Sequence, residues 1–319
     1  MHLLSVSSLY KQQGSFALKD ISFQQLPFQK IAIAGETGSG KSTLLKIIAG
    51  LVQPDGGQVL FEGKRVTGPL EQLVPGHPGI AYLSQHYELR NNYRMEELLE
   101  YANKLPEEKA QALYRLCRID HLLKRKNDQL SGGEKQRIAL AKLLTQTPRL
   151  LLLDEPFSNL DPIHKNILKR VLEDIGKEWQ ITCLLTSHDP LDTLSWADEI
   201  IAMKDGQIVQ QAPAEEIYRN PLNDYIAGLF GSYNRFDKTD VVLFPSLSAL
   251  PMNGKPLYLR PEQFRIVTAA DADAVKGAIQ QISFWGSYYE IQVLIGHKQV
   301  VVKTMQPPDP QQEWLYLSL

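Results

Sequence analysis

The sequence has little cysteine and almost no excess of charge. Its two cysteines, Cys117 and Cys183, stand in surroundings typical of a helix and a buried strand rather than of metal ligands. Two such thiols cannot form a disulfide framework, so we expect both to be inert. Across the 319 residues, 34 Lys and Arg face 36 Asp and Glu. The chain therefore lacks the global basic field of proteins that bind nucleic acid or anionic lipid, and any such contact would be local.

Long apolar segments are also missing. The purest apolar run, at 150–153, is followed at once by Asp154 and Glu155, whereas a membrane helix needs roughly 20 apolar residues. The first ten residues contain neither a basic segment nor an apolar stretch of signal-peptide length. We expect a protein that is not exported and that is soluble or peripheral to a membrane.

Alternating strand and helix patterns predict an α/β core. Short continuous apolar runs, as expected of strands buried in a parallel sheet, occur at 31–34, 80–84, 150–153, 181–186 and 199–203. The stretch from about 86 to 147 instead has charges and leucines at helical spacing, notably at 95–104 and 107–123. We interpret it as a helical insertion in a doubly wound sheet.

The pattern changes near residue 235. Short β-like runs separated by Pro, Gly and Asn recur without helices at 240–244, 257–260, 277–284, 288–295, 299–303 and 314–317. Strands at this spacing predict a small antiparallel barrel. We therefore predict two domains, an α/β domain over 1–235 and an all-β domain over 236–319.

A glycine-rich loop joins the predicted strand at 31–34 to a predicted helix at 42–49. Residues 35–42, GETGSGKS, match G-x-x-x-x-G-K-[ST] in the strand–loop–helix context that gives the pattern meaning. Backbone N–H groups of such a loop bind phosphate oxygens, the lysine neutralises the β- and γ-phosphates, and the hydroxyl coordinates Mg²⁺. The predicted Mg-ATP ligands here are Gly35, Gly38, Ser39, Gly40, Lys41, Ser42 and Thr43. A plain turn with a surface lysine is the alternative.

An acidic pair, Asp154 and Glu155, ends the apolar run at 150–153. The carboxyl ends of strands are where open α/β sheets bind ligands. We expect Asp154 to hold the metal and Glu155 to polarise the attacking water as general base. The alternative is an ordinary charge pair at a strand end.

The most specific segment is LSGGEKQR at 130–137. With it the chain resembles the ATP-binding cassette (ABC) transporter ATPases, whose hallmark is L-S-G-G-x-x-Q-R upstream of the acidic strand. The serine and glycines open a helix and form a second anion-binding N-terminus, which one ATP cannot share with the first. The resemblance implies that Ser131 and Gly133 of one subunit contact the nucleotide held by another. A plain N-capped helix is the alternative.

Four further residues match the family's motifs in order. Gln85 looks like the glutamine that reaches the metal and the attacking water, and His188 like the switch histidine on the γ-phosphate. Asp161, in SNLD at 158–161, is similar to the aspartate of the loop that crosses the dimer interface. Tyr10 resembles the aromatic that stacks on adenine, with Phe16 as the weaker candidate. Taken singly, each would be read as a turn or packing residue.

The C-terminal part carries a narrower likeness. LYLRPEQFR at 257–265 and SFWGSYYE at 283–290 look like the oligomer-binding-type (TOBE) domain of importer ATPases for sugars, polyamines, iron(III), sulfate or molybdate. The sequence does not select one of these substrates. The segment at 86–93 lacks the family's aromatic-Pro-His stretch, and Lys142 stands where the family often has Arg. In the family the membrane partner docks on the surface that includes the segment at 86–93, so we expect the membrane partner of this chain to be divergent.

The resemblance implies the ABC ATPase fold, an α/β P-loop NTPase core with a helical insertion, followed by an OB-like barrel. It also implies a subunit of an importer that uses ATP and Mg²⁺, closes as a homodimer and grips permease subunits at the cytoplasmic face of the membrane. A solute-binding protein would deliver the cargo, and nucleic acid is not an expected partner. Two rivals stay open: a soluble ABC protein of DNA repair or translation, which usually has two cassettes or a long coiled-coil insertion, and a regulator whose barrel binds a small oxyanion.

Overall fold

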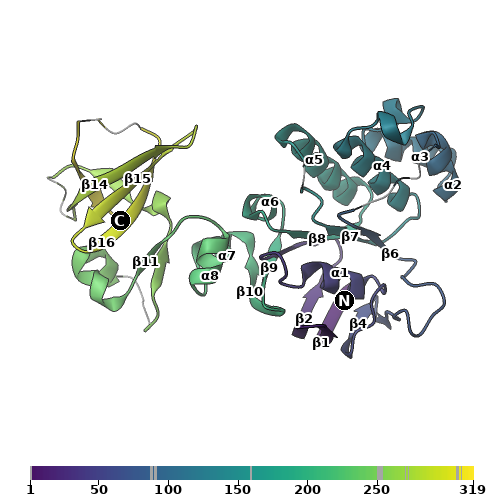
Figure 1. The fold of residues 1–319 in the computed structure, drawn as a ribbon, viewed down its shortest axis with the longest axis horizontal. Helices are drawn as coiled ribbons and strands as arrows, with labels where there is room; N and C mark the ends of the chain where they lie inside the picture. Colours follow the sequence, from purple (N-terminus) through teal and green to yellow (C-terminus); the bar gives the residue numbers. More distant parts are fainter. Residues whose placement is uncertain are drawn as a thin grey trace. The chain divides into compact units, whose positions relative to one another are not determined.

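The computed structural model describes residues 2–86, 89, 92–158, 160–249, 254–269, 271, 273–306, 309 and 311–319. The chain divides into two compact units, Met1–Ala214 and Glu215–Leu319 (Figure 1). The domain boundary predicted from the sequence, between 235 and 236, lies further along the chain. Helices α7 (Ala214–Arg219) and α8 (Asp224–Leu229) fall at the start of the second unit.

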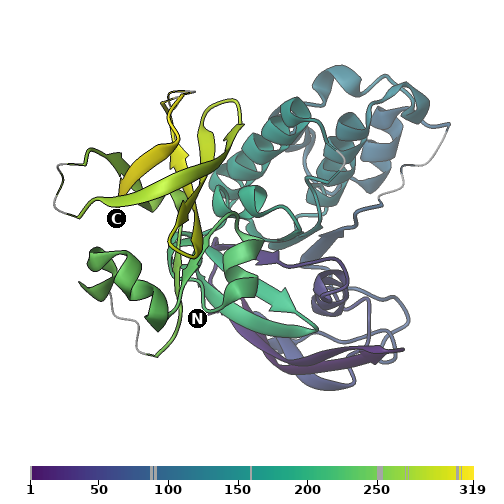
Figure 2. The same cartoon turned by 60° about the vertical axis from the view of Figure 1, so that its left-hand side comes forward.

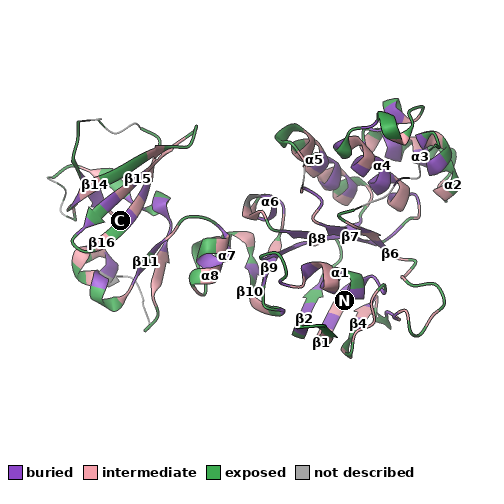
Figure 3. Cartoon of the chain, in the orientation of Figure 1, coloured by how far each residue is buried: buried purple, intermediate pink, exposed green. Residues whose placement is uncertain are grey.

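A six-stranded sheet of order β10-β9-β3-β8-β7-β6 forms the centre of the first unit. Its strands are β3 (Lys30–Ala34), β6 (Ile80–Leu83), β7 (Leu150–Asp154), β8 (Thr182–Ser187), β9 (Glu199–Lys204) and β10 (Gln207–Pro213). All pairings are parallel except that of β10 with β9, and every residue of β7 and β8 is buried (Figure 3). The five predicted parallel strands are thus confirmed.

The register of this sheet brings particular residues to one edge. Ala34 at the end of β3 pairs with Ser187 of β8, and Asp154 at the end of β7 pairs with Thr186. Because parallel strands end at a common edge, the glycine-rich loop, the acidic pair and the segment after β8 leave the sheet as neighbours.

A second, antiparallel sheet has the order β2-β1-β4-β5. It contains β1 (Leu4–Gln13), β2 (Phe16–Gln25), β4 (Gly56–Phe61) and β5 (Lys64–Arg65). Helix α1 (Lys41–Ile48) lies between the two sheets (Figure 1), and its Leu44 and Leu45 share one buried cluster with Leu9 and Leu152. Burial of these leucines fixes the helix that follows the glycine-rich loop.

The predicted helical insertion is confirmed. It contains α2 (Met95–Ala102), α3 (Glu107–Leu116), α4 (Gly132–Leu144) and the 3₁₀ turns at Asp120–Leu122 and Asn127–Gln129. Helix α3 is shorter than the predicted 107–123 because Arg118 adopts a left-handed φ of 54°. Two more helices follow, α5 (Pro162–Glu178) and α6 (Pro190–Leu194). Among the described residues, no helix is both long and apolar enough to cross a bilayer.

The second unit is built mainly of antiparallel strands. A five-stranded curled sheet of order β13-β17-β14-β15-β16 accompanies the pair β11 and β12 (Figure 2). The strands are β11 (Asn234–Phe236), β12 (Leu257–Leu259), β13 (Arg265–Val267), β14 (Val275–Phe284), β15 (Tyr289–Ile295), β16 (Lys298–Thr304) and β17 (Trp314–Ser318). The predicted barrel-like β domain is confirmed in class.

One predicted strand of this unit is wrong. Residues 240–244 do not form a strand, because the 3₁₀ segment Lys238–Leu243 occupies most of the range. The Asp240 carboxylate, 5% exposed, accepts from the Asp237 N–H (2.9 Å) and pairs with Lys298 (2.8 Å). Such a local hydrogen bond competes with strand formation. Val242 made the run look strand-like, but its side chain is exposed.

A buried arginine joins α7 and α8 to the β-sheet part of the second unit. Arg260 follows β12, is 1% exposed and stacks over the ring of Tyr218 at 4.2 Å. Its guanidinium donates to the carbonyls of Tyr218 (2.9 Å), Ala227 (2.9 Å) and Gly231 (3.1 Å). A cation at the carbonyl end of a helix is favourable, so Arg260, the arginine of LYLRPEQFR at 257–265, has a structural role.

Candidate active site

The glycine-rich loop leaves β3 and enters α1 through residues with no room for a side chain. Gly40 is the N-cap of α1 with φ 99°, and a Cβ there would lie 2.5 Å from Cζ of Phe16. At Gly35 an added Cβ would lie 2.4 Å from the carbonyl oxygen of Met203. Gly38 also has a positive φ, of 87°. Only glycine fits both the conformation and the space at positions 35 and 40.

Lys41 is turned back over this loop. Its Nζ donates to the carbonyls of Gly35 (2.7 Å) and Glu36 (2.8 Å) and lies 3.5 Å from Ser39 Oγ. The side chain is 4% exposed, and burial lowers the pKa of Lys41, against the opposing effect of the Glu155 carboxylate. A desolvated ammonium beside the glycine-rich loop is suited to a polyanionic ligand.

Asp154 is the most completely hydrogen-bonded carboxylate at the sheet edge. Its Oδ1 accepts from Ser42 Oγ (2.8 Å) and from Thr186 Oγ1 (2.8 Å), and its Oδ2 accepts from the Tyr82 hydroxyl (2.8 Å). Burial and the Asp154 charge raise the pKa of Tyr82, so the phenol stays a donor. The carboxylate and the Ser42 hydroxyl are hard oxygen donors of the kind Mg²⁺ prefers. Ser42 and Thr43 both lie in the first turn of α1.

Sequence reasoning missed Tyr82 and Thr186. Each lies near the carboxyl end of a strand adjacent to β7, in β6 and β8. Each is a polar residue inside a predicted strand, a signal that does not by itself identify the group that the side chain contacts.

Glu155 and His188 meet at the same edge. Glu155 adopts a left-handed φ of 47°, a conformation that is uncommon outside glycine and recurs at active sites. Its N–H donates to Thr186 Oγ1 (2.9 Å), and its Oε2 lies 2.8 Å from His188 Nδ1. The Glu155 side chain is 14% exposed and that of His188 53%. A mostly buried carboxylate is thus held beside a histidine open to solvent.

The turn after Glu155 connects Gln85 and Ser158, which belong to two of the predicted motifs, to this site. Ser158 Oγ donates to the Glu155 carbonyl (2.8 Å), and Gln85 Nε2 lies 3.5 Å from Ser158 Oγ. Gln136 of α4 donates to the Pro156 carbonyl (2.6 Å). The structure therefore brings Gln85 to the loop that bears Glu155, while Asn159 of the predicted interface loop lies outside the described residues.

Ser131, Gly133 and Asp161 form a separate group. Ser131 caps α4, accepting from the Glu134 N–H (3.3 Å), and its own N–H donates to the Glu134 carboxylate (2.8 Å). Asp161 caps α5 and lies 2.6 Å from His164 Nδ1. A Cβ on Gly133 would come within 2.8 Å of the His164 ring. In the described part of the chain, no hydrogen bond joins this group to the glycine-rich loop.

The two aromatic candidates for adenine are placed differently. Tyr10 lies in β1 opposite Gly56, and its hydroxyl donates to Gln12 (3.2 Å). Phe16 at the start of β2 is the aromatic whose ring closely approaches Gly40 of the loop. The weaker candidate from the sequence is therefore the one in contact with the loop in this structure.

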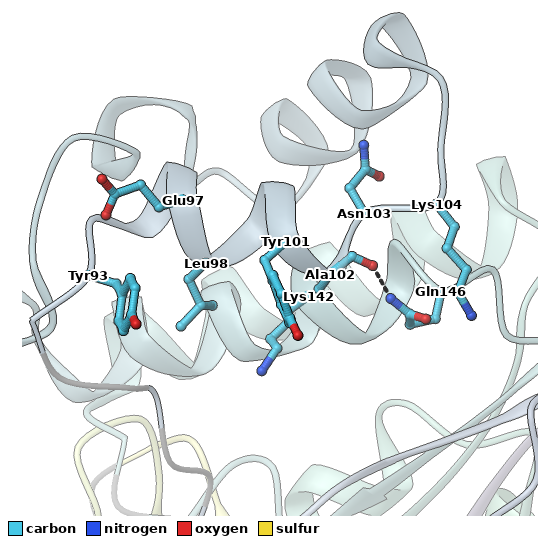
Figure 4. A pocket seen from close by; sticks show the side chains of 9 residues that line it. All are labelled: Tyr93, Glu97, Leu98, Tyr101, Ala102, Asn103, Lys104, Lys142 and Gln146. Carbon is cyan, nitrogen blue, oxygen red and sulfur yellow. Dashed lines mark hydrogen bonds between the residues drawn. The ribbon is translucent and has the colours of Figure 1, made fainter.

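A groove of about 640 Å³ lies along α2 and α4 (Figure 4). Tyr93, Leu98 and Tyr101 extend from α2 and the residues before it, and Lys142 extends from α4. Gln146 donates to the Ala102 carbonyl, and the groove is also lined by Glu97, Asn103 and Lys104. Within the described ranges, no ion pair joins Lys104 or Lys142 to a carboxylate.

Comparison with known families and structures defines the class. Residues 18–158 match the family described as "ABC transporter", and residues 257–314 match the TOBE domain. The structure of cbiO1 from Clostridium perfringens, part of the ABC transporter complex cbiONQ, is similar over 69% of this chain and 91% of that one, with a TM-score of 0.61 and 27% identity. The ADP conformation of MJ1267, another ATP-binding cassette, covers 71% of this chain and 98% of its own, with a TM-score of 0.61 and 27% identity. These matches define an ABC ATPase with a TOBE domain.

Sequence relatives narrow the assignment. The sulfate/thiosulfate import ATP-binding protein CysA of Synechocystis sp. is 32% identical over 96% of this chain and 89% of its own length. The CysA protein of Bacillus cereus is 36% identical over 73% of this chain and 68% of its own. The chain belongs to the ATP-binding subunits of ABC importers. It binds and hydrolyses ATP to power solute uptake through membrane permease subunits.

Thr186→Val should uncouple Asp154 and Glu155 from β8. Valine keeps the shape but removes the donor to Asp154 and the acceptor of the Glu155 N–H, which should lower the free energy of unfolding by about 1–3 kcal/mol and reduce ATP hydrolysis. Thr182→Val in the same strand removes the acceptor of the Phe28 N–H and is the matched control. Urea denaturation and ATPase assays of both variants test this, and equal ATPase rates in the two would contradict the role given to Thr186.

Proposed function

We propose that the chain hydrolyses Mg-ATP at composite sites formed when two copies close on each other. The observation that supports this most directly is the cluster at the edge of the sheet. There Asp154 bonds to Ser42 of α1, and Glu155 lies 2.8 Å from His188. These side chains converge beside the glycine-rich loop from α1, β7 and the segment after β8.

The residue roles follow from charge and position. Lys41 neutralises the β- and γ-phosphates bound by the loop. Ser42 and Asp154 would hold Mg²⁺, which supplies further charge neutralisation at the phosphates. Glu155 accepts a proton from the attacking water, and His188 orients the Glu155 carboxylate and reaches the γ-phosphate. Gln85, linked to the Glu155 loop through Ser158, responds to the metal and the attacking water.

The second half of each site is supplied by the other copy. Ser131 and Gly133 form a helix N-terminus suited to an anion, but their contacts in this chain are with Glu134 and His164 rather than with the glycine-rich loop. Asp161 lies with them. Ser131, Gly133 and Asp161 of the other copy, placed over the glycine-rich loop, would complete the site. ATP bound between the two copies would then drive their closure.

Glu155→Gln should separate binding from turnover. Glutamine keeps the shape of the side chain but cannot take a proton, so hydrolysis should slow by about 10²–10⁴-fold while the affinity for Mg-ATP stays nearly unchanged. The variant should accumulate as an ATP-bound dimer. Steady-state ATPase assays, calorimetric titration with Mg-ATP and size-exclusion chromatography measure the three quantities. A wild-type turnover rate would remove Glu155 from the catalytic role.

Mixing two inactive variants tests the composite site. Ser131→Arg places bulk and positive charge against the partner's nucleotide, whereas Lys41→Ala disables the chain's own phosphate loop. Each variant alone should be inactive, and their mixture should recover part of the activity because one site of the heterodimer combines both intact halves. Mixing should be done at high protein concentration to favour the dimer. If Ser131→Arg weakens ATP binding by the monomer as strongly as Lys41→Ala does, the site is complete within one chain.

The cargo we infer is sulfate or a related oxyanion. The relatives whose names specify sulfate and thiosulfate import align with this chain across both units, over 96% of its length. In this assembly the subunit acts at the cytoplasmic face of the membrane, and a solute-binding protein delivers the anion to the permease.

The groove along α2 and α4 is the docking surface that we propose for the permease. It combines the aromatic side chains Tyr93 and Tyr101 with the lysines Lys104 and Lys142 (Figure 4). A cytoplasmic segment of the permease that carries apolar and acidic side chains would complement both features. Two residues of the groove, Tyr93 and Lys142, lie where the sequence departs from its family.

Reversing the groove charges should uncouple ATP hydrolysis from transport. In Lys104→Glu/Lys142→Glu, sulfate uptake by proteoliposomes containing the permease should fall at least about tenfold, because like charges would face each other. The ATPase rate of the isolated subunit should not change. Lys109→Glu, on α3 outside the groove, is the control. Full uptake and normal copurification with the permease would refute docking at this groove, whereas absence of sulfate uptake by the wild type would refute only the cargo.

A further inference from the structure

A buried carboxylate ties α5 to α6. Asp192 lies in α6, and its side chain is 4% exposed. Two lysines of α5 neutralise it: Lys165 Nζ lies 3.0 Å from one oxygen and Lys169 Nζ lies 3.1 Å from the other. A carboxylate this deeply buried is costly unless it is paired, so the two helices are held in one arrangement.

Lys165 also reaches beyond Asp192. Its Nζ lies 3.1 Å from Oδ2 of Asp189, the residue directly after His188. Lys169 instead makes its other contacts with Ser195 (3.2 Å) and the ring of Phe157. The two lysines thus share Asp192, but of the two it is Lys165 that also pairs with Asp189.

The segment that carries His188 is therefore fastened on both sides. Before it, Thr186 bonds to Asp154 and to the Glu155 N–H. After it, Asp189 is held by Lys165. The Asp189 N–H also donates to Ser187 Oγ (3.0 Å), so a short turn spans His188 between the two anchors. His188 itself is half exposed and lies 2.8 Å from Glu155.

The helix that bears Lys165 is itself well fixed at this point. Lys165 lies in the first turn of α5, which Asp161 caps by accepting the N–H groups of Ile163 and His164. The ring of His164 packs against Gly133 at the start of α4. Lys165, which pairs with Asp189, therefore lies in the same turn of α5 as His164, which packs against Gly133.

We propose that Lys165 is a positioning residue for hydrolysis: by pairing with Asp189 it sets His188 against Glu155. Asp192 keeps the Lys165 ammonium in place for this contact. The inference rests on the proposed role of His188 in ATP hydrolysis and adds a residue that touches neither nucleotide nor metal.

Paired methionine variants test the proposal. Lys165→Met and Lys169→Met each remove one cation from Asp192, but only the first also breaks the ion pair with Asp189. We expect kcat for ATP hydrolysis to fall roughly 10- to 100-fold in Lys165→Met, as for other small displacements of catalytic groups. The Kd for Mg-ATP should change less than about twofold. Lys169→Met should lose comparable thermal stability yet keep kcat near the wild-type value, and Lys165→Arg should restore most of the lost rate.

A second comparison separates positioning from general loosening. In a His188→Ala background, Lys165→Met should cause no further loss of kcat, because the group it positions is already gone. Asp189→Asn breaks the same ion pair from the other side and serves if Lys165→Met fails to fold. Equal kcat losses in Lys165→Met and Lys169→Met, or a full additional loss in the His188→Ala background, would overturn the proposal. Unchanged kcat in His188→Ala alone would instead refute the proposed role of His188.

Discussion

The structure of the candidate active site, at the carboxyl edge of the six-stranded sheet, depends on the buried Asp154 carboxylate. It receives hydroxyl donors from three separate elements, Ser42 of α1, Tyr82 of β6 and Thr186 of β8. A buried charge needs such partners. The hydrogen bonds to the two oxygens of Asp154 therefore fix α1, β6 and β8 relative to β7. Thr186 then extends the same network to the backbone of Glu155. Ser42, Asp154 and Glu155 are thus held together by the hydrogen-bonding needs of one buried carboxylate.

Much of this edge follows from the sequence, because chain topology and local motifs determine it. Strands buried on both faces have continuous apolar runs, and a parallel sheet brings their carboxyl ends together. Lys41, Ser42, Asp154 and Glu155 could therefore be placed before any coordinates were known. Tyr82 and Thr186 could not, because a single polar residue in a strand does not reveal which neighbour it faces until the strand order β8-β7-β6 is known.

The errors and gaps in prediction arise where side chains oppose local propensity. The valines at 241 and 242 favour a strand, yet Asp240 accepts a local hydrogen bond from the Asp237 N–H, and Lys298, 58 positions away in sequence, pairs with the same carboxylate. In the same way, the contact of Phe16 with Gly40 depends on how β2 packs over the loop, and Lys165 shows no motif that marks its pairing with Asp189. Long-range contacts of this kind leave no periodic signal.

Arg260 has a consequence for how this protein can be divided into parts. Its guanidinium is buried against carbonyls of Tyr218, Ala227 and Gly231, so a β-barrel fragment that begins at 236 would keep the cation and lose its acceptors. The segment before 236 also supplies the Tyr218 ring over which the guanidinium stacks, so its removal would expose Arg260 to water and leave β12 without the contacts that connect it to α7 and α8. The exchangeable unit is therefore the β domain together with α7 and α8, and a fusion that joins it to another ABC ATPase domain should be made before Ala214.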